Sequence, residues 1–298
     1  MKRAIVSGAA GFAGCNLTER LIEDGYTVYA LVRAGSRHNE RLSGYSADAL
    51  KLIEADMGDY DFLPDKIHDN CDIFFHLAWT GGRDDFEAQR RNIDASLKAL
   101  EAAVKIGCKR FVASGSQAEY GVKSGLITED LMGNPFSAYG ASKLSACYLT
   151  RFRASQLGIE WVWGRIFSLI GKYEPEGRLM PDIIRKLKNH ETPHISAASQ
   201  NWDYLDAKDA AEAIIALGEH GKSGEIYNIA NGDYHPLKFF MEEVRAIYAP
   251  DIRIEYGEPP VPYVSLMPSV EKIHCDTGWK AKIGFAETVR ENYWDVTV

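Results

Sequence analysis

Ser116, Tyr139 and Lys143 are residues whose types and spacing suit the transfer of a proton to or from an oxygen atom. Tyr139 and Lys143 are four residues apart, so a helix would place both side chains on one face. A free tyrosine, with a pKa of about 10, transfers protons poorly at neutral pH unless a neighbouring ammonium group stabilises its phenolate. Ser116 ends the run FVASGS and is expected to hydrogen-bond the same substrate oxygen. We therefore predict a catalytic centre made of these three side chains.

A glycine-rich turn near the N-terminus, GAAGFAG, indicates which second reactant is bound. It follows the apolar run AIVS directly and precedes a helical pattern, which is the context that gives such glycines meaning. Gly8 permits a tight turn, Gly11 lets backbone amides approach a pyrophosphate, and Gly14 lets the helix pack closely on the strand. With Phe12 and Ala13 in the first helical turn, the segment predicts a site for a nicotinamide dinucleotide. Together with the tyrosine centre, it predicts hydride transfer.

The end of the second expected strand favours one dinucleotide over the other. An acid at this position accepts hydrogen bonds from the ribose 2′-hydroxyl of NAD(H) but repels the 2′-phosphate of NADP(H). The segment ALVR has no acid there, and Arg33 and Arg37 would pair with a phosphate. NADP(H) is therefore favoured and NAD(H) stays open; alternatively, both arginines are solvated loop charges. At the end of the third strand, Asp56 beside Met57 would accept a hydrogen bond from the adenine amino group.

Short β-branched or aromatic runs alternate with longer helical patterns over the first half of the chain. The runs expected to form strands are AIVSG, TVYALV, LKLIEAD, DIFFHLA, RFVASGS and EWVWGRI. Helical patterns cover 16–24, 88–106 and 138–156. This order predicts an α/β fold, specifically a Rossmann-type doubly wound parallel sheet.

The rhythm changes after Gly171, where proline becomes more frequent in KYEPEGRLMP and YGEPPVPYVSLMP. We expect residues 1–170 to form a dinucleotide-binding domain, with a return segment at about 201–230. Residues 171–298 would form mainly a smaller mixed α/β substrate-binding lobe at the C-terminal side. Such a lobe would lie over the carboxyl edge of the sheet, where folds of this type bind ligands.

Composition disfavours several other classes of protein. The 298 residues, of which 46% are apolar, can bury a large core, and the net charge of −8 disfavours a sequence-independent nucleic-acid binder. We expect no signal peptide and no membrane-spanning helix. The five cysteines, at 15, 71, 108, 147 and 275, form no CxxC or Cys/His cluster. Neither a disulfide framework nor a metal site is therefore predicted, and a reduced, cytoplasmic location fits best.

Taken together, these motifs resemble the extended short-chain dehydrogenase/reductase family, in its NAD(P)-dependent sugar epimerase/dehydratase group. The segments that carry the resemblance are the glycine turn, Asp56, His76-Leu77-Ala78, Asn92, Ser116 to Gly121, Tyr139 with Lys143, Arg165-Ile166-Phe167, YLDAKDAAEA and IHCDTGWKAKIGF. The resemblance implies that Ser116, Tyr139 and Lys143 are a catalytic triad and that Ala78 and Phe167 lie beside the cofactor. It further implies that Tyr139 and Lys143 also contact the cofactor, with Lys143 hydrogen-bonded to the nicotinamide ribose. It also implies a homodimer formed through two helices of each subunit.

Departures from the family pattern help to choose the reaction. Dehydratases of this group follow the catalytic hydroxyl with an adjacent Asp-Glu pair, where this sequence has Gln117 and Ala118. Ala118 also replaces the Glu of sugar-acid decarboxylases and the Cys of the epimerase–reductase that makes a fucose nucleotide. Net reduction of a ketone and 4-epimerisation remain, and the basic strand end favours reduction with exchangeable NADPH.

We therefore expect NADP(H)-dependent reduction of a keto group on a nucleotide-linked (6-deoxy)hexulose, with the proton supplied by Tyr139. One alternative is an NAD-dependent nucleotide-sugar 4-epimerase. Another is a non-catalytic, dinucleotide-sensing regulator, since fold does not dictate function. Such regulators commonly lose the reactive Tyr or Lys, and this chain keeps both.

The expected substrate lobe departs from the family at two places. Ser168 stands where the family usually has Asn, and Gln200-Asn201-Trp202 stands where it has an Arg for the substrate diphosphate. Arg178 would supply the missing cation or is a surface charge. The candidate substrate contacts are Trp79, Gln117, Ser168, Arg178, Asn201 and Trp202. The aromatic members also suit core packing.

Overall fold

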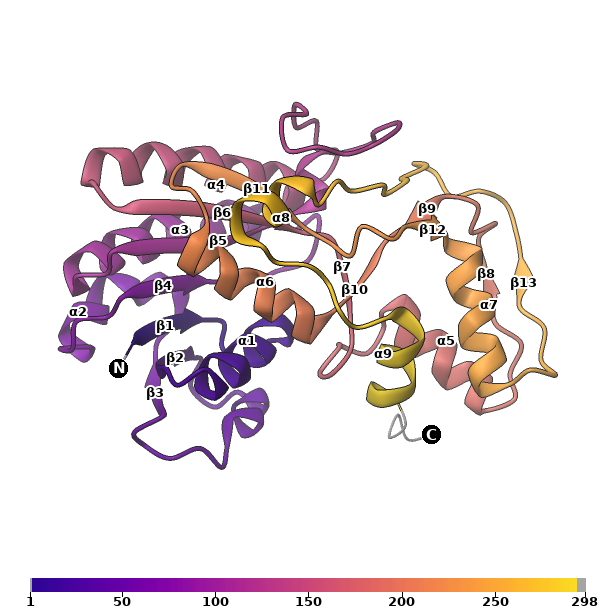
Figure 1. The fold of residues 1–298 in the computed structure, drawn as a ribbon, viewed down its shortest axis with the longest axis horizontal. Coiled ribbons are helices and arrows are strands. Elements are labelled where there is room, and N and C mark those ends of the chain that lie inside the picture. Colours follow the sequence, from indigo (N-terminus) through magenta and orange to yellow (C-terminus); the bar gives the residue numbers. More distant parts are fainter. Residues whose placement is uncertain (1, 294–298) are drawn as a thin grey trace.

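The computed structural model describes residues 2–293 and contains a seven-stranded parallel sheet in the order β11-β6-β5-β4-β1-β2-β3 (Figure 1). The strands are β1 (Arg3–Ser7), β2 (Thr27–Val32), β3 (Leu50–Glu54), β4 (Ile73–His76), β5 (Arg110–Ser116), β6 (Glu160–Ile166) and β11 (Glu225–Ile229). The strand order reverses between β1 and β4, which is the switch point of a doubly wound sheet. The predicted Rossmann-type fold is confirmed.

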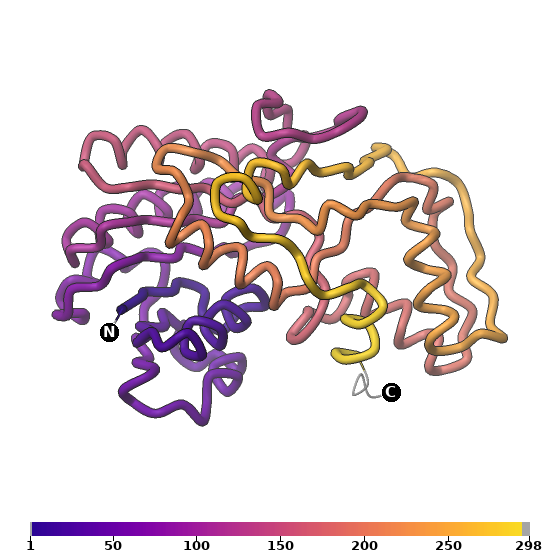
Figure 2. Tube along the Cα trace, in the orientation of Figure 1, coloured from indigo at the N-terminus to yellow at the C-terminus, as the bar shows by residue number. Residues whose placement is uncertain are grey.

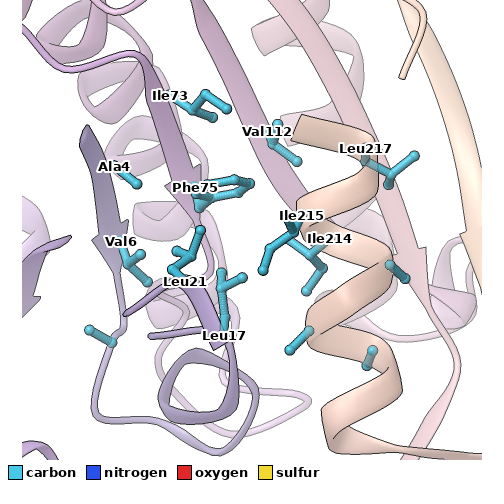
Figure 3. Close-up of a cluster of buried hydrophobic side chains, with 14 of the residues drawn as sticks. Ala4, Val6, Leu17, Leu21, Ile73, Phe75, Val112, Ile214, Ile215 and Leu217 are labelled. Atoms are coloured by element: carbon cyan, nitrogen blue, oxygen red, sulfur yellow. The ribbon is translucent and has the colours of Figure 1, made fainter. Parts of the chain in front are cut away.

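Both faces of the sheet are covered by helices. The covering helices are α1 (Phe12–Glu23) and α6 (Ala207–His220) on one face, and α3 (Phe86–Ile106) and α4 (Ala138–Leu157) on the other. Ala4, Val6 and Phe75 pack with side chains of α1 and α6, as Figure 3 shows, whereas Ile5 and Phe74 point to the α3 and α4 side. Strands buried on both faces read as continuous apolar runs, which explains TVYALV in β2.

The start of α4 is set by a side-chain cap. Ser137 Oγ accepts a hydrogen bond from the Gly140 amide at 3.1 Å, which satisfies one of the free amides of the first turn. Tyr139 therefore lies in that first turn, and its own amide donates to the Arg83 carbonyl oxygen at 2.9 Å. The cap and this backbone bond together fix the beginning of α4 beside the loop that follows β4.

Short helices follow the carboxyl ends of β2, β3 and β5. They are η1 (Arg37–Leu42), η2 (Met57–Phe62) with α2 (Leu63–Lys66) after it, and η3 (Gln117–Glu119). The third strand ends at Glu54, earlier than the predicted run of 50–56, because Asp56 turns the chain. Its carboxylate accepts a hydrogen bond from the Gly58 amide at 3.1 Å and so caps η2.

The rest of the chain builds a second lobe, on the right in Figure 1, around an apolar core of its own. Its elements are α5 (Leu179–Lys188), β8 (His194–Ile195), β9 (Asn201–Trp202), β12 (His235–Pro236), α7 (Leu237–Tyr248), β13 (Glu255–Tyr256) and α9 (Phe285–Asn292). Ile184 of α5, Phe240 of α7 and Val289 of α9 meet in this core. The two lobes thus bury separate apolar clusters, and the carboxyl edge of the sheet faces the second lobe.

The chain passes between the lobes more than once, a path that Figure 2 traces by colour. The connecting elements are β7 (Ser168–Ile170), β10 (Tyr204–Asp206) and α8 (Glu271–Thr277). After β7 the chain enters the second lobe, comes back through β10, α6 and β11, and leaves again before α7. β7 and β10 pair in parallel, and α8 packs against α6 and β11. The seventh strand of the sheet is therefore made from late sequence.

Candidate active site

The glycine turn follows β1 and packs against the residues that follow β4. Gly8 has a φ of 70°, which favours glycine, and a Cβ atom there would lie 2.9 Å from the Ala78 Cα and amide nitrogen. A Cβ at Gly14 would lie 2.1 Å from the Gly8 carbonyl oxygen, so α1 packs directly on the turn. Gly11 is the N-cap of α1 and brings no side-chain cap, which leaves the first amides of the helix open to an anion. The turn therefore fits the pyrophosphate of a dinucleotide.

A buried hydrogen-bond chain supports the same edge of the sheet. Ser7 Oγ lies 2.8 Å from His76 Nδ1, and His76 Nε2 lies 3.1 Å from Ser96 Oγ on α3. Ser7 Oγ also accepts hydrogen bonds from the Leu77 and Ala78 amides at 3.1 and 3.2 Å. Burial lowers the pKa of His76 to about 3, so the imidazole is neutral near pH 7. These bonds fix the backbone beside the glycine turn.

A groove runs from the glycine turn across the ends of β2 and β3. Gly8, Gly11, Leu31, Met57, Ala78 and Trp79 line its walls, and Arg33, Ser36, His38 and Asn39 line its outer end. Among the described residues that line the groove there is no carboxylate. Burial, and then the positive charges of Arg41, Arg37 and Arg33, lower the pKa of His38. The outer end of the groove is therefore cationic.

Two residues predicted beside the adenosine take different places. Met57 lines the groove, whereas the exposed Asp56 uses its carboxylate to cap η2. Phe167, which the family resemblance places beside the cofactor, is 5% exposed and packs in an apolar cluster with Tyr120 and Leu266. Roles for Asp56 and Phe167 in cofactor binding remain predictions.

Ser116, Tyr139 and Lys143 come together at the carboxyl end of β5. The Ser116 side chain lies close enough to Tyr139 to lower its pKa through hydrogen bonding, and Lys143 Nζ donates to the Ser114 carbonyl oxygen at 2.7 Å. Lys143 is 3% exposed, so its ammonium group is almost withdrawn from solvent. The hydroxyl groups of Ser116 and Tyr139 are thus placed to share one oxygen atom of a substrate.

Burial dominates the protonation of this centre. It lowers the pKa of Lys143 to about 7, and the Glu119 carboxylate opposes the shift. Burial raises the pKa of Tyr139, while the Ser116 hydrogen bond and the charges of Arg178 and Arg83 lower it. Lys143 is not among the groups that shift the pKa of Tyr139 here, because its ammonium group donates to the Ser114 carbonyl oxygen, and its expected effect on the pKa of Tyr139 stays a prediction.

Trp79 contacts both ionisable residues of the centre. Lys143 Nζ lies 3.7 Å from the centroid of the Trp79 ring, and the Tyr139 ring meets the indole edge-on at 6.1 Å. The indole Nε1 donates to Gln89 Oε1 at 2.8 Å, and Gln89 Nε2 donates to the Gly82 carbonyl oxygen at 2.8 Å. Gln89 is 1% exposed. The indole is thus held in a fixed orientation beside the proton-transfer residues.

Asn92 holds the loop after β4. Its Oδ1 accepts a hydrogen bond from the Thr80 amide at 3.1 Å, and its Nδ2 donates to the Thr80 carbonyl oxygen at 2.8 Å. Asn92 and Gln89 are three residues apart on one face of α3. They therefore act together on the segment that carries Trp79 and Arg83.

Two arginines lie near Tyr139 without acidic partners. Arg178 is the N-cap of α5, and its Cζ lies 5.7 Å from the centroid of the Phe12 ring in the glycine turn. Arg83 Cζ lies 5.3 Å from the centroid of the Phe136 ring. Both arginines are exposed, and neither forms an ion pair with another described residue. Both are close enough to lower the pKa of Tyr139, so an anionic group of a substrate would find unpaired cations there.

The other predicted substrate residues are more scattered. Gln117 is half-buried directly after Ser116, and Ser168 is half-buried in β7. Asn201 and Trp202 form β9 of the second lobe, where Asn201 Nδ2 donates to Met267 Sδ at 3.1 Å. Trp202 packs between two apolar clusters, and its Nε1 has no hydrogen-bond partner among the described residues.

Sequence reasoning did not single out several residues that support the centre. They are Ser7, His38, Asn39, Arg83, Gln89 and Glu119. The polar run SRHN after Arg33 was a signal for His38 and Asn39, and the spacing of Gln89 from Asn92 was a signal for a shared helix face. The sequence did not indicate a supporting role for Ser7 or Glu119. A single polar residue at the end of an apolar run is as compatible with an ordinary loop position as with a functional one.

Neither membrane nor metal features are found in the described part of the chain. None of its helices is long and apolar enough to cross a membrane. Over residues 2–293, no three His, Cys, Asp or Glu side chains are grouped so that they could hold a metal ion.

Comparisons with known proteins agree with this geometry. Residues 4–230 match the model of the NAD dependent epimerase/dehydratase family. The chain is 27% identical to the UDP-glucose 4-epimerase of Corynebacterium glutamicum over 325 aligned residues, which cover 99% of this chain and 95% of the relative.

Solved structures share the fold over nearly the whole chain. The UDP-N-acetylglucosamine 4-epimerase of Methanobrevibacter ruminantium, in complex with UDP-N-acetylmuramic acid, superposes with a TM-score of 0.87 at 25% identity, covering 98% of this chain and 97% of that one. RMD from Pseudomonas aeruginosa, complexed with NADPH, has a TM-score of 0.80 at 22% identity, covering 99% of each chain. The second likeness concerns the fold alone.

Proposed function

The chain belongs to the NAD dependent epimerase/dehydratase family, as its motifs predicted, and on that basis we propose that it is an NADP(H)-dependent reductase of a nucleotide-linked keto-sugar. Family membership and the relatives establish the coarser activity, which is nucleotide-sugar chemistry with a nicotinamide dinucleotide. The proposal adds the direction of the reaction, the favoured cofactor and the residues that carry out the chemistry.

The observation that carries the proposal is the cationic outer end of the groove. Arg33 follows β2 directly, and Ser36, His38 and Asn39 complete this end with hydrogen-bonding groups. A 2′-phosphate would meet an arginine there and would face no carboxylate among the described lining residues. NADPH is consumed and exchanged in a net reduction, so a preference for it supports a reductase.

The centre around Tyr139 has the groups that a ketone reduction needs. NADPH, when bound in the groove, would supply a hydride to the carbonyl carbon. Tyr139 delivers its proton to the carbonyl oxygen, and the Ser116 hydroxyl donates a hydrogen bond to the same atom. Lys143, one helical turn further along α4, balances the negative charge that develops on the tyrosine oxygen.

Residues after Ser116 support reduction over dehydration. Elimination of water from a sugar requires an acid and a base beside the reacting carbons. The half-buried Gln117 and the buried Ala118 stand at these positions and cannot exchange protons near neutral pH. The site therefore suits hydride transfer alone.

Arg178 and Arg83 suit the diphosphate of a nucleotide sugar. Gln200-Asn201-Trp202 stands where the family has an arginine for this group, and the Trp202 indole Nε1 lacks a partner among the described residues. The unpaired guanidinium groups of Arg178 and Arg83 are close enough to Tyr139 to lower its pKa and would bind the phosphates in place of the family arginine. Trp79, Gln117, Ser168 and Asn201 are proposed to contact the sugar or base.

A nucleotide-sugar 4-epimerase is the second candidate, because several of the relatives bear that name. An epimerase oxidises and reduces the same carbon and regenerates one tightly held NAD. It would need the same Ser116, Tyr139 and Lys143. The two functions therefore differ in cofactor preference and in net cofactor consumption.

The test supplies NADPH with a nucleotide-linked 4-keto-6-deoxy sugar. A reductase oxidises the cofactor stoichiometrically and yields one 4-hydroxy product, followed by absorbance of the reduced nicotinamide and by product mass. Interconversion of two 4-hydroxy sugars without net cofactor consumption would establish the epimerase instead. Inactivity towards every nucleotide sugar would contradict both.

We further propose a homodimer formed through α3 and α4 and a cytoplasmic location. Tyr148, Leu149 and Phe152 of α4 are 52%, 47% and 67% exposed, which is unusual for large apolar side chains. Light scattering after size exclusion should give twice the mass of one chain, and Phe152→Glu should reduce it. A monomeric wild type would contradict the dimer.

Four of the cysteines are buried thiols, in keeping with a reducing compartment.

A further inference from the structure

Glu119 is a fully buried carboxylate, 0% exposed, directly behind the catalytic serine. Its Oε1 accepts hydrogen bonds from the Ser116 amide at 2.8 Å and from Trp163 Nε1 at 3.0 Å. Its Oε2 accepts from Arg165 Nε at 2.7 Å, and Arg165 is itself only 2% exposed. Every contact is thus a charge-assisted bond inside the protein.

A buried ion pair of this kind adds little to the free energy of unfolding. Withdrawing a carboxylate and a guanidinium from water is costly, and well-packed apolar side chains often serve the fold equally well. Gly115 leaves room for the Glu119 carboxylate and the Trp163 indole. A Cβ atom at Gly115 would lie 2.0 Å from Trp163 Nε1 and 2.5 Å from Glu119 Oε1. The position of the ion pair points to a role at the end of β5.

The end of β5 is held from two sides. Glu119 binds the Ser116 amide, and Lys143 Nζ binds the Ser114 carbonyl oxygen two residues earlier. The Glu119 carboxylate and the Lys143 ammonium group therefore both hydrogen-bond to the backbone of the same short segment, Ser114 to Ser116. Loss of either contact would loosen the segment that carries the catalytic hydroxyl.

We propose that Glu119 is a positioning residue of the hydride-transfer centre, whose carboxylate fixes the Ser116 backbone and supplies the negative charge that faces Lys143. The inference rests on the proposed function, since it gives Lys143 and Ser116 their roles. It adds an electrostatic partner that lies outside the catalytic triad and touches neither substrate nor cofactor.

The groups around Lys143 make the charge of Glu119 important. Burial lowers the pKa of Lys143 to about 7, and Glu119 is the group that raises it. His76 of β4 is neutral, with a pKa of about 3, and Tyr139 on the same helix is protonated near pH 7 because burial raises its pKa. Glu119 is therefore the negative charge that opposes the effect of burial and favours the protonated form of Lys143, with Arg165 bound to its other oxygen.

The experiment compares Glu119→Gln with Asp209→Asn. Asp209 is a buried carboxylate, 2% exposed, that accepts the Lys282 and Ile283 amides at 2.8 Å each, away from the centre. Both changes should lower the melting temperature. NADPH affinity is then titrated from about pH 5 to about pH 9 by fluorescence, without sugar, together with turnover of the keto-sugar.

Only Glu119→Gln should move the pH profile. Affinity for the anionic cofactor falls as Lys143 loses its proton, and removal of Glu119 should shift this midpoint to lower pH by about one unit. Turnover should fall about tenfold or more, with KM nearly unchanged. Glu119→Asp, which keeps the charge, should keep the wild-type midpoint.

A midpoint in Glu119→Gln that coincides with those of the wild type and Asp209→Asn would overturn the proposal. If Glu119→Gln does not fold, Glu119→Asp carries the test through turnover: its shorter carboxylate should no longer hold the Ser116 amide, and wild-type turnover in a folded Glu119→Asp would overturn the proposal. A wild type that binds NADPH but reduces no nucleotide sugar would contradict the proposed function only, because the midpoint is measured without sugar.

Discussion

The inner and outer ends of the cofactor groove are built in different ways. At the inner end, polar groups are buried and paired, as in Ser7 with His76 and Lys143 with the Ser114 carbonyl oxygen. At the outer end, Arg33 is exposed, as is Arg37 of the neighbouring η1, which is not among the lining residues, and neither forms an ion pair with another described residue. One end is a closed network, and the other is a set of independent charges.

Because of this difference, we expect substitutions at the two ends of the groove to differ in their effect on protein stability. Removing one member of a buried network leaves a partner unsatisfied and destabilises the protein. Exposed cations can be replaced with little effect on folding. On the proposed function, we therefore expect substitutions at the inner end to change turnover and substitutions at the outer end to change the choice of dinucleotide.

The largest effect is expected from Tyr139→Phe, which removes the transferred proton at the inner end. Turnover should fall by about 10²- to 10⁴-fold while NADPH affinity changes little. Lys143→Ala should reduce both quantities. Steady-state kinetics and fluorescence titration would measure them, with Tyr148→Phe, half exposed on the same helix, as the matched control. Equal and mild effects of the two changes would argue against this centre.

Ser7→Ala should destabilise the fold by about 1 to 3 kcal/mol. The change leaves His76 Nδ1 and two backbone amides without their buried partner. Urea unfolding would give the free energy, with the exposed Ser124→Ala as a control that should change it by less than about 0.5 kcal/mol. An equal effect of both substitutions would remove the distinction between the two ends.

Arg33→Asp should change the cofactor preference by at least about tenfold, from NADPH towards NADH. The substitution exchanges a partner of the 2′-phosphate for an acceptor of the ribose 2′-hydroxyl, and the melting temperature should stay the same. Titration of both cofactors would measure it, with Arg253→Asp, exposed on the second lobe, as the charge control. A wild type that prefers NADH several-fold would make the epimerase the leading candidate.

The smallest effect concerns Glu174, on the loop after β7. Burial raises its pKa from 4.5 to about 7, although the Tyr293 hydroxyl donates a hydrogen bond to it. A raised pKa means that its contribution to stability is complete below about pH 4.5 and is lost as the pH rises through about 7.

Glu174→Gln should therefore gain stability relative to wild type as the pH rises through that range. Urea unfolding at several pH values would measure the difference, with the exposed Glu176→Gln on the same loop as the control. A difference between Glu174→Gln and wild type that does not change with pH would refute this expectation.

Sequence patterns predicted the sheet well, because its strands are nearly continuous apolar runs. TVYALV and EWVWGRI coincide with β2 and β6. The third strand was predicted too long, because the capping role of Asp56 depends on its contact with the Gly58 amide. The sequence shows that Asp56 and Gly58 are close in the chain, but it does not show that the Asp56 carboxylate binds the Gly58 amide.

The candidate site was predicted where chemistry restricts residue types, as for Tyr139 and Lys143. It was not predicted where the role depends on distant partners. Glu119, which follows β5, meets Trp163 and Arg165 of the neighbouring strand β6, and Gln89 of α3 meets Trp79 of the loop after β4. No local pattern records such pairs.

The late origin of β11 affects how the protein is made. β6 lies beside β5 on one side and beside β11 on the other, so it is an edge strand until Ile229 has been synthesised. A nascent chain on the ribosome therefore exposes the unpaired backbone groups of β6 while α5, β8 and β9 of the second lobe are being translated. The last strand of the sheet is synthesised only after these elements of the other lobe, so the sheet is not completed in one uninterrupted stretch of translation.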